Sequence, residues 1–266
     1  GLVAVGRAHR LLGDLEEAHG ELKRAWDLGY HSPEAAVELG LAKAGLYRRL
    51  LMPRTGADRV ERQQDLDARY RKPAIELLRL ARLGSASATP DLAQAELALT
   101  EERYEEALRL AQRARENQGW LYESHLLEAE VHMQKALRAS DGRRHQEAEA
   151  LLVLAGEALA KALEIGRSAP AVYLLEARRR TDLLRVRAES GRGGADNRLR
   201  DWALEACEAA RRIRPRGWEA ATCRALAHLS WAPQLSARGE DPRTELKLGI
   251  EAAEEALAQR PESNET

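Results

Sequence analysis

The chain has 266 residues, of which 32% are charged and 4% are aromatic, and it contains no phenylalanine. Its formal net charge is −1 at pH 7, which argues against a general nucleic-acid binder, since such proteins carry a basic excess. With so few aromatic residues, the core has to rest on alanine and leucine. No apolar run approaches the ~18 residues of a membrane-spanning helix, so we expect a cytoplasmic segment without membrane contact.

The first residues predict two helices. Residues 2–12 form an amphipathic segment that Gly13 ends, and Asp14 is expected to cap the following helix, with Glu17 completing a capping box. Further helix starts are expected where a capping side chain precedes proline, because proline is tolerated in the first helical turn. This signal occurs at Ser32-Pro33, Thr89-Pro90 and Asp241-Pro242.

A pattern of small residues recurs along the chain at spacings of four and three, which places its members on one face of a helix. Small side chains there let a neighbouring helix approach closely. Such repetition predicts a helical repeat protein, in which each unit buries its surface against its neighbours. The copies are Ala18/Leu22/Ala25, Ala74/Leu78/Ala81, Ala107/Ala111/Ala114, Ala155/Leu159/Ala162, Ala203/Cys207/Ala210 and Gly249/Ala253/Ala256.

These segments resemble the tetratricopeptide repeat family, which repeats a helix–turn–helix unit of ~34 residues. The matches include Gly13, Leu15 and Ala18 in the first unit, and Ala210 and Pro215 in the fifth. The resemblance implies an all-α fold, a right-handed superhelix of about six antiparallel helix–turn–helix repeats over residues 1–261. A polar tail is expected at 262–266.

The spacing departs from the family, because successive copies lie 56, 33, 48, 48 and 46 residues apart. We therefore expect lengthened helices and longer loops inside the repeats, and loop insertion costs little entropy per added residue. The expected loops are Pro53–Lys72, Ser140–Gln146, Ser190–Asn197 and Ser236–Asp241.

A narrower resemblance is to the repeat region downstream of some bacterial Hanks-type serine/threonine protein kinases. The Gly-rich phosphate loop, H-R-D and D-F-G of the kinase itself are absent from the sequence. The resemblance therefore implies a regulatory or substrate-recruiting region that is not itself an enzyme. The matching stretches are Leu46–Arg49, Ala68–Ala74, Glu102–Ala107, Trp120–Glu123 and Gly239–Arg243.

Few residues suggest chemistry. His125, Glu128 and His132 share a helix face and form a possible metal site, but packing or exposure is the favoured interpretation. Cys207 and Cys223 are too few for a disulfide framework or a cysteine-based zinc site, and we expect them to fill small helix positions. No metal or other cofactor is predicted.

The family usually binds a protein or peptide along the first helix of each unit, and we expect an acidic or phosphorylated partner because arginine binds such groups bidentately. A ligand-sensing module of another bacterial regulator is the alternative, and a closed apolar pocket with convergent polar groups would favour it. An unrecognised hydrolase is a further alternative. The predicted partner-binding residues are Arg7, Arg10, Glu96, Glu130, Arg179 and Arg224, on a face that also includes Val3, Val37, Leu41, Leu99 and Met133.

Overall fold

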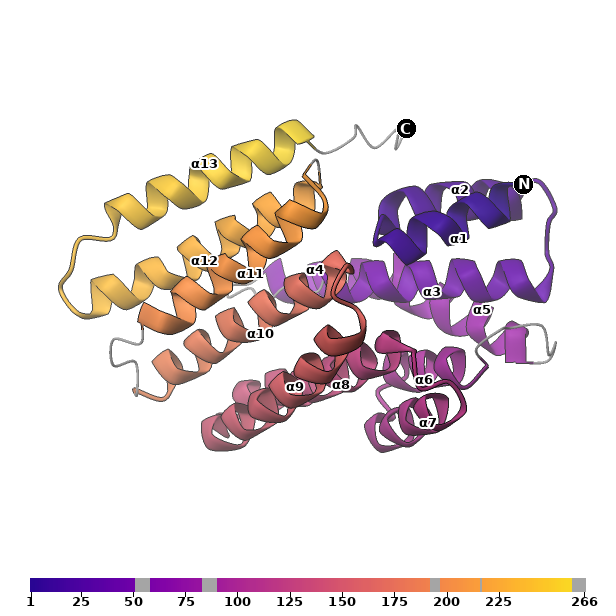
Figure 1. Ribbon diagram of the computed structural model, residues 1–266, viewed down its shortest axis with the longest axis horizontal. Helices are drawn as coiled ribbons and strands as arrows, with labels where there is room; N and C mark the ends of the chain where they lie inside the picture. Colours follow the sequence, from indigo (N-terminus) through magenta and orange to yellow (C-terminus); the bar gives the residue numbers. More distant parts are fainter. Residues whose placement is uncertain (51–57, 83–89, 192–196, 216, 260–266) are drawn as a thin grey trace. The chain divides into compact units, whose positions relative to one another are not determined.

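The computed structural model describes residues 1–50, 58–82, 90–191, 197–215 and 217–259, and all regular secondary structure in these ranges is helical (Figure 1). The all-α prediction is confirmed to that extent. The chain divides into two compact units, Gly1–Leu127 and Glu128–Thr266. The arrangement of residues 1–261 as one superhelix of six repeats stays a prediction. No helix in the described ranges has both the length and the hydropathy to cross a membrane.

In the first unit, helices pack in pairs that we call hairpins: α1 against α2, α3 against α5, with α4 and η1 between them in sequence, and α6 against α7. Each hairpin also contacts the next one, through α2 with α3 and through α5 with α6. The elements are α1 (Leu2–Leu12), α2 (Leu15–Asp27), α3 (Pro33–Leu50), α4 (Asp58–Leu66), the π-helix η1 (Asp67–Arg71), α5 (Lys72–Arg82), α6 (Pro90–Thr100), α7 (Tyr104–Asn117) and the first part of α8 (Tyr122–Asp141).

The second unit contains longer helices, of 17 to 21 residues, as the wide spacing of the small-residue pattern predicts. Here α10 packs against α11 and α12 against α13, while α9 contacts α10 and α11 contacts α12. Its elements are the rest of α8, α9 (His145–Ile165), α10 (Pro170–Glu189), α11 (Asn197–Ile213), α12 (Trp218–Ala237) and α13 (Arg243–Gln259).

The same tight turn joins the two helices of several hairpins. A residue with positive φ follows the first helix, and its N–H and that of the next residue donate to carbonyls of the last helical turn. Glycine suits this left-handed conformation because it lacks a Cβ. The turn residue is Gly13 before α2, Glu102 before α7, Arg143 before α9 and Gly239 before α13, with φ of 87°, 64°, 57° and 74°.

The small-residue pattern marks the helix crossings. Ala18, Ala107 and Ala203 are completely buried, as predicted. In the last copy the pattern is less complete, because Ala253 is only half-buried. The side chain of Ala81 is not among those that the structure describes. Apart from these two alanines, all members of the pattern are buried.

The loop predicted over Pro53–Lys72 is largely helical. Residues 51–57 lie outside the described part of the chain, but α4, η1 and the first residue of α5 occupy the rest. The segment contains no glycine or proline after Gly56, and helix-favouring residues offset its polarity. An ion pair between Asp65 and Arg69, 2.9 Å apart at i and i+4, adds a small stabilisation.

The predicted caps are formed in part. The hydroxyl of Ser32 accepts the backbone N–H of Ala35 at 3.1 Å, as expected of a capping serine. Asp14 does occupy the N-cap of α2, but its side chain makes no capping hydrogen bond. The predicted capping box is therefore wrong: the Asp14 carboxylate lies 3.4 Å from Nδ1 of His9 instead. Thr89 lies outside the described residues.

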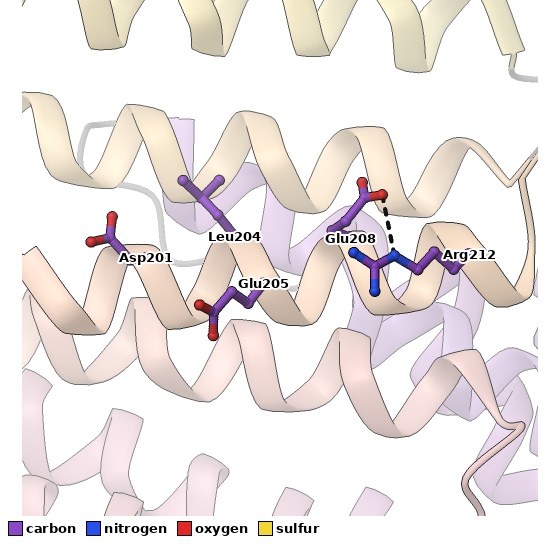
Figure 2. Close-up of a pocket in the computed structure, with 5 residues that line it drawn as sticks. All are labelled: Asp201, Leu204, Glu205, Glu208 and Arg212. Carbon is purple, nitrogen blue, oxygen red and sulfur yellow. Dashed lines mark ion pairs between the residues drawn. The ribbon is translucent and has the colours of Figure 1, made fainter.

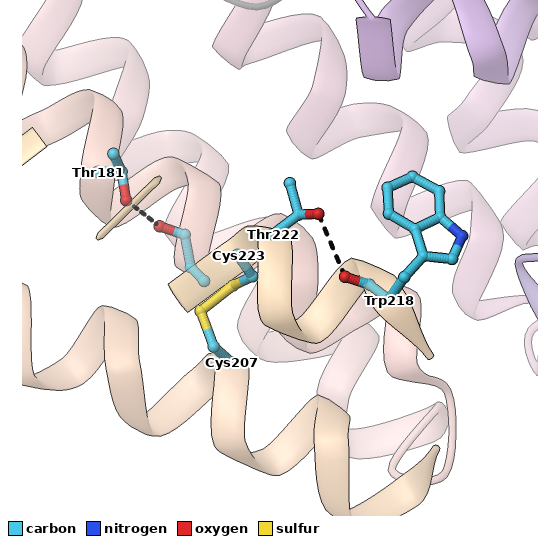
Figure 3. Close-up of a disulfide and its surroundings, with 6 residues drawn as sticks. Thr181, Cys207, Trp218, Thr222 and Cys223 are labelled. Carbon is cyan, nitrogen blue, oxygen red and sulfur yellow. Dashed lines mark hydrogen bonds between the residues drawn. A yellow bond between two sulfur atoms is a disulfide. The ribbon is translucent and has the colours of Figure 1, made fainter. Parts of the chain in front are cut away.

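The expectation for the cysteines is corrected by a disulfide between Cys207 of α11 and Cys223 of α12 (Figure 3). Cys207 is completely buried and belongs to a small core cluster with Ala177 and Ala206. The sequence placed Cys207 correctly at a small helix position. It gave no sign that a second cysteine 16 residues away would face it from the next helix.

Candidate functional site

The first helices of the hairpins in the first unit carry a charged surface, which we call the α1–α3–α6 surface. It consists of Arg7 and Arg10 on α1, Glu34, Glu38 and Arg48 on α3, and Glu96 on α6. Three of the predicted partner-binding residues, Arg7, Arg10 and Glu96, belong to it. Arg7 and Arg10 lie on α1 and Glu96 lies on α6, and both of these helices contact α3.

Helix packing positions the two arginines of α1. Gly6 lies at the crossing of α1 and α2, where an added Cβ would stand 2.5 Å from Cγ of Leu22. This contact sets how closely α1 sits on its hairpin partner. Arg7 and Arg10 follow within the next turn and reach α3, with which α1 also packs.

Glu38 is the centre of this part of the surface, and its side chain is only 7% exposed. The Nε of Arg10 donates to one of its carboxylate oxygens at 2.6 Å, and Nε of Arg7 lies 3.5 Å from the other. An isolated buried carboxylate would be costly, so these partners offset its lost hydration. The acid sits inside the apolar run AAVELGLA, and that local contrast is a sequence signal for a buried ion pair.

Arg7 forms the exposed rim of the surface. Its side chain is 42% exposed. Its second partner is Glu34, whose side chain is 53% exposed and whose Oε1 lies 3.6 Å from Nη1 of Arg7. Exposed pairs of this kind contribute only about 0–1 kcal/mol. By contrast, the side chain of Arg10 is 20% exposed and held at short range. Arg7 is therefore the arginine that can exchange its ion pair at low cost.

Arg48 and Glu96 extend the surface from α3 to α6. The guanidinium donates to both carboxylate oxygens, at 2.7 and 3.1 Å, and the two side chains are 13% and 17% exposed. This bidentate geometry fixes the orientation of the guanidinium relative to the carboxylate and makes the ion pair a strong one. Glu96 was predicted to contact a partner, but in the structure it joins two helices.

The start of α8 lies within electrostatic reach of Arg10. Burial raises the pKa of Glu123, while Arg10 acts in the opposite direction. Burial likewise raises the pKa of Tyr122, again with Arg10 opposing the shift. Residues far apart in sequence thus share one electrostatic environment within the first unit.

Arg179 and Arg224, the predicted arginines of the second unit, make their contacts within that unit. Both Nε and Nη2 of Arg179 donate to Glu176 at 2.7 Å, and its Nη1 donates to the Leu152 carbonyl at 3.2 Å. A Cβ added at Gly156 of α9 would stand 3.0 Å from Cζ of the Arg179 guanidinium. The glycine therefore leaves room for this guanidinium between α9 and α10. Arg224 pairs with Glu255, which joins α12 to α13.

Glu130 on α8 is half-buried and has polar contacts of its own within the chain. The apolar members of the predicted face are mostly core rather than surface. Val37, Leu99 and Met133 are all buried, and Val37 belongs to a core cluster with Ala18 and Leu22 of α2.

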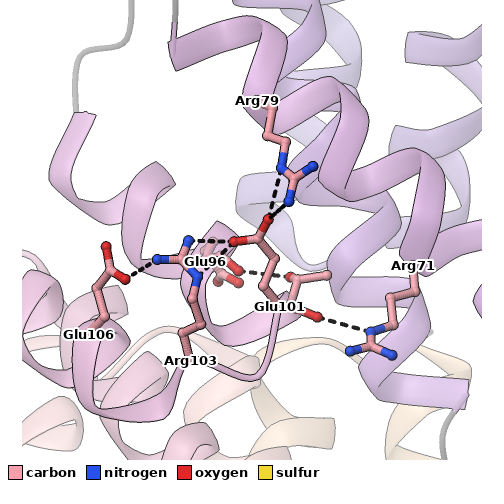
Figure 4. Close-up of polar contacts among 7 residues, drawn as sticks. Arg71, Arg79, Glu96, Glu101, Arg103 and Glu106 are labelled. Carbon is pink, nitrogen blue, oxygen red and sulfur yellow. Dashed lines mark hydrogen bonds and ion pairs between the residues drawn. The ribbon is translucent and has the colours of Figure 1, made fainter.

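A second charged cluster surrounds the turn between α6 and α7 (Figure 4). Glu101 accepts hydrogen bonds from Nε of Arg79 on α5 and Nε of Arg103, both at 2.8 Å. Burial alone would raise the pKa of Glu101, but the hydrogen bonds from Arg103 and Arg79 outweigh it and lower the pKa. Arg71 donates to the Thr100 carbonyl at 2.9 Å, so the cluster ties the second hairpin to the third.

A shallow hollow of about 430 Å³ runs along one side of α11 (Figure 2). Its side chains come from that single helix, so it is an open depression rather than the closed apolar pocket that would favour ligand sensing. Its lining residues are Asp201, Leu204, Glu205, Glu208 and Arg212.

Within the described ranges, no group of three or more histidine, cysteine, aspartate or glutamate residues is arranged to hold a metal ion. His125 instead lies 3.4 Å from Arg115. His132 is half-buried on α8, and both it and Glu128 have polar contacts within the chain. Comparison of the sequence with protein-family models and with curated proteins gives no match.

Proposed function

We propose that this chain is a non-catalytic, tetratricopeptide-like scaffold that binds an extended acidic or phosphorylated segment of a partner protein. The observation that supports the proposal is the α1–α3–α6 surface, where the first helices of successive hairpins carry charged residues in ion pairs, one group between α1 and α3 and one pair between α3 and α6. An extended segment matches the geometry of a surface built from parallel rows of helices. The resemblance to kinase-associated repeats adds the role of a regulatory or substrate-recruiting region of a bacterial serine/threonine kinase.

Arg7 is the expected contact residue. A partner carboxylate or phosphate can replace the exposed Glu34 at its guanidinium, while the pair of the half-buried Arg10 with the buried Glu38 keeps the helices in place. Replacing one exposed acid by another costs little, and a phosphate offers more acceptor oxygens for bidentate binding. The same reasoning predicts affinity that falls with ionic strength.

The test is an array of extended peptides in neutral, acidic and phosphorylated versions, probed with the labelled chain. We expect the acidic or phosphorylated peptides to be retained at low salt, and Arg7→Glu to reduce that retention at least about tenfold, the loss of ~1.4 kcal/mol. Arg212→Glu is the matched control, because Arg212 is 76% exposed and only loosely paired with Glu208 at 3.6 Å.

Circular dichroism checks that both variants remain helical. Equal loss with Arg7→Glu and Arg212→Glu would show that binding follows net charge rather than this surface. Equal retention of neutral and acidic peptides would remove the charge-based mechanism. Phosphoryl transfer or hydrolysis by the purified chain would contradict the non-catalytic assignment.

A further inference from the structure

The last helix of the second unit has two adjacent faces with different surroundings. One face packs on α12 and is buried: Gly249 lies where an added Cβ would stand 2.9 Å from the Leu229 side chain, and Ala252 and Ala256 are covered. In Figure 1, α12 runs alongside this helix. The second face, about a quarter-turn around the helix, is open.

This open face carries a stripe of apolar residues, Leu246, Ile250, Ala253 and Leu257, which we call the α13 stripe. The spacings of four, three and four residues match the a and d positions of a coiled-coil seam. Leu246, Ile250 and Leu257 are 40%, 54% and 71% exposed. Single exposed apolar residues need no explanation, but an apolar row along one helix face marks a site of interaction.

On the last helix of the preceding hairpin, α11, the residue equivalent to Ala253 is covered by another helix. Cys207 on α11 corresponds in the repeated pattern to Ala253 on α13. Cys207 is completely buried and bonded to the next helix, α12, whereas Ala253 is only half-buried. Ala253, within the α13 stripe, thus occupies a position that a neighbouring helix covers in the preceding hairpin.

We propose that the α13 stripe is covered by the α13 of a second copy of the chain, packed antiparallel to form a two-fold symmetric dimer. The charges beside the stripe favour this occupant. The exposed cations Arg243 and Lys247 stand in the first half of α13, and the acids Glu251 and Glu254 stand in the second half. A helix with this asymmetry complements itself only when the second copy runs in the opposite direction.

The register follows from the seam. Pairing a with d positions sets Leu246 opposite Leu257 of the second copy, and Ile250 opposite Ala253 of the second copy. Lys247 then lies across from Glu254 of the second copy, twice by symmetry. In a parallel pair, Lys247 would lie beside Lys247 of the second copy and Glu254 beside Glu254, so that like charges would face each other. The existing contact of Lys247 with Glu251, at 3.7 Å between largely exposed side chains, is weak enough to be exchanged.

Sedimentation velocity over a concentration series of the full chain tests the proposal. The wild type should shift from the 29.6 kDa monomer to twice that mass and no further. Ile250→Arg should weaken self-association at least about tenfold, because it places a cation in the seam. Leu248→Arg is the matched control: Leu248 is 39% exposed but lies on the opposite side of the helix from the stripe.

A charge exchange tests the direction of the pair. Lys247→Glu should weaken the dimer by facing Glu254 of the second copy, and adding Glu254→Lys should restore it. A wild type that stays monomeric throughout would overturn the proposal, as would a ladder of species beyond the dimer, which indicates head-to-tail stacking. A dimer that survives Ile250→Arg, or one that the second substitution does not restore, would also overturn it.

Discussion

The disulfide between α11 and α12 gives a prediction whose size follows from the chain length it closes. The two cysteines are 16 residues apart, and in the chain-entropy treatment a loop of that length contributes about 3 kcal/mol at 25 °C. For a unit of this size, that corresponds to a fall in Tm of roughly 6–12 °C when the bond is reduced. The loss should appear in the transition of the second unit.

Burial determines how the bond must be reduced. Cys207 is completely buried and Cys223 partly so, in contact with Ala177 and Ala206. A reductant therefore reaches the bond through local opening, and we expect reduction in native buffer to be slow and to accelerate in mild denaturant. After reduction, the two thiol groups have to fit into the space that the disulfide bond occupied in this packed cluster.

The assay is differential scanning calorimetry of the oxidised chain and of the chain reduced in denaturant and refolded with reductant. Thiol titration should find no free thiol before reduction and two after it. The control is Cys207→Ala/Cys223→Ala, whose Tm should not respond to reductant at all. Two free thiols in the chain as purified without reductant, or an unchanged Tm after complete reduction, would refute the reasoning.

Two further predictions concern pH and the hairpin turns. Burial, reinforced by Lys43, lowers the pKa of His19 to about 4, so the neutral ring is favoured in the folded state and stability should fall by up to about 3 kcal/mol as pH drops from 6.5 towards 4. Urea titrations across this range should show a smaller fall for His19→Gln, and identical pH profiles would contradict the assignment. Arg143 is exposed with φ of 57°, so Arg143→Gly should raise the free energy of unfolding by ~0.5–1 kcal/mol, whereas Gly13→Ala should lower it by a similar amount. Urea melts measure both, and a loss of stability in Arg143→Gly would mean that the turn is not strained.

The local features of the fold could be predicted from the sequence. The first helix over residues 2–12 and the buried faces through Ala107 and Ala203 follow from periodicity and breakers, which act within one or two helical turns. The error over Pro53–Lys72 has a local cause as well, because high polarity was given more weight than the absence of breakers. Asp14 shows that a capping residue can sit at the right position and still direct its side chain elsewhere.

The pairing of side chains between helices was beyond such rules. Cys207 meets Cys223 only because α12 lies over α11 in a particular rotation, and a spacing of 16 residues does not encode that rotation. The same holds for Arg179, whose predicted partner role rested on its helix register. In the structure its guanidinium is used inside the unit, between α10 and the Leu152 carbonyl of α9.

Under the proposed function, the arginines of the first unit would have two separate roles: Arg10 would stabilise the fold and Arg7 would contact the partner. Displacing Glu38 from Arg10 would leave a buried carboxylate without its closest partner, and breaking buried pairs costs ~3–5 kcal/mol. Displacing Glu34 from Arg7 exposes an acid that is already in water, at a cost within about 1 kcal/mol. A partner acid therefore gains most by approaching the rim at Arg7, where it adds an interaction without removing a structural one. Because each such contact is weak and screened by salt, selectivity has to come from several contacts in register along an extended segment.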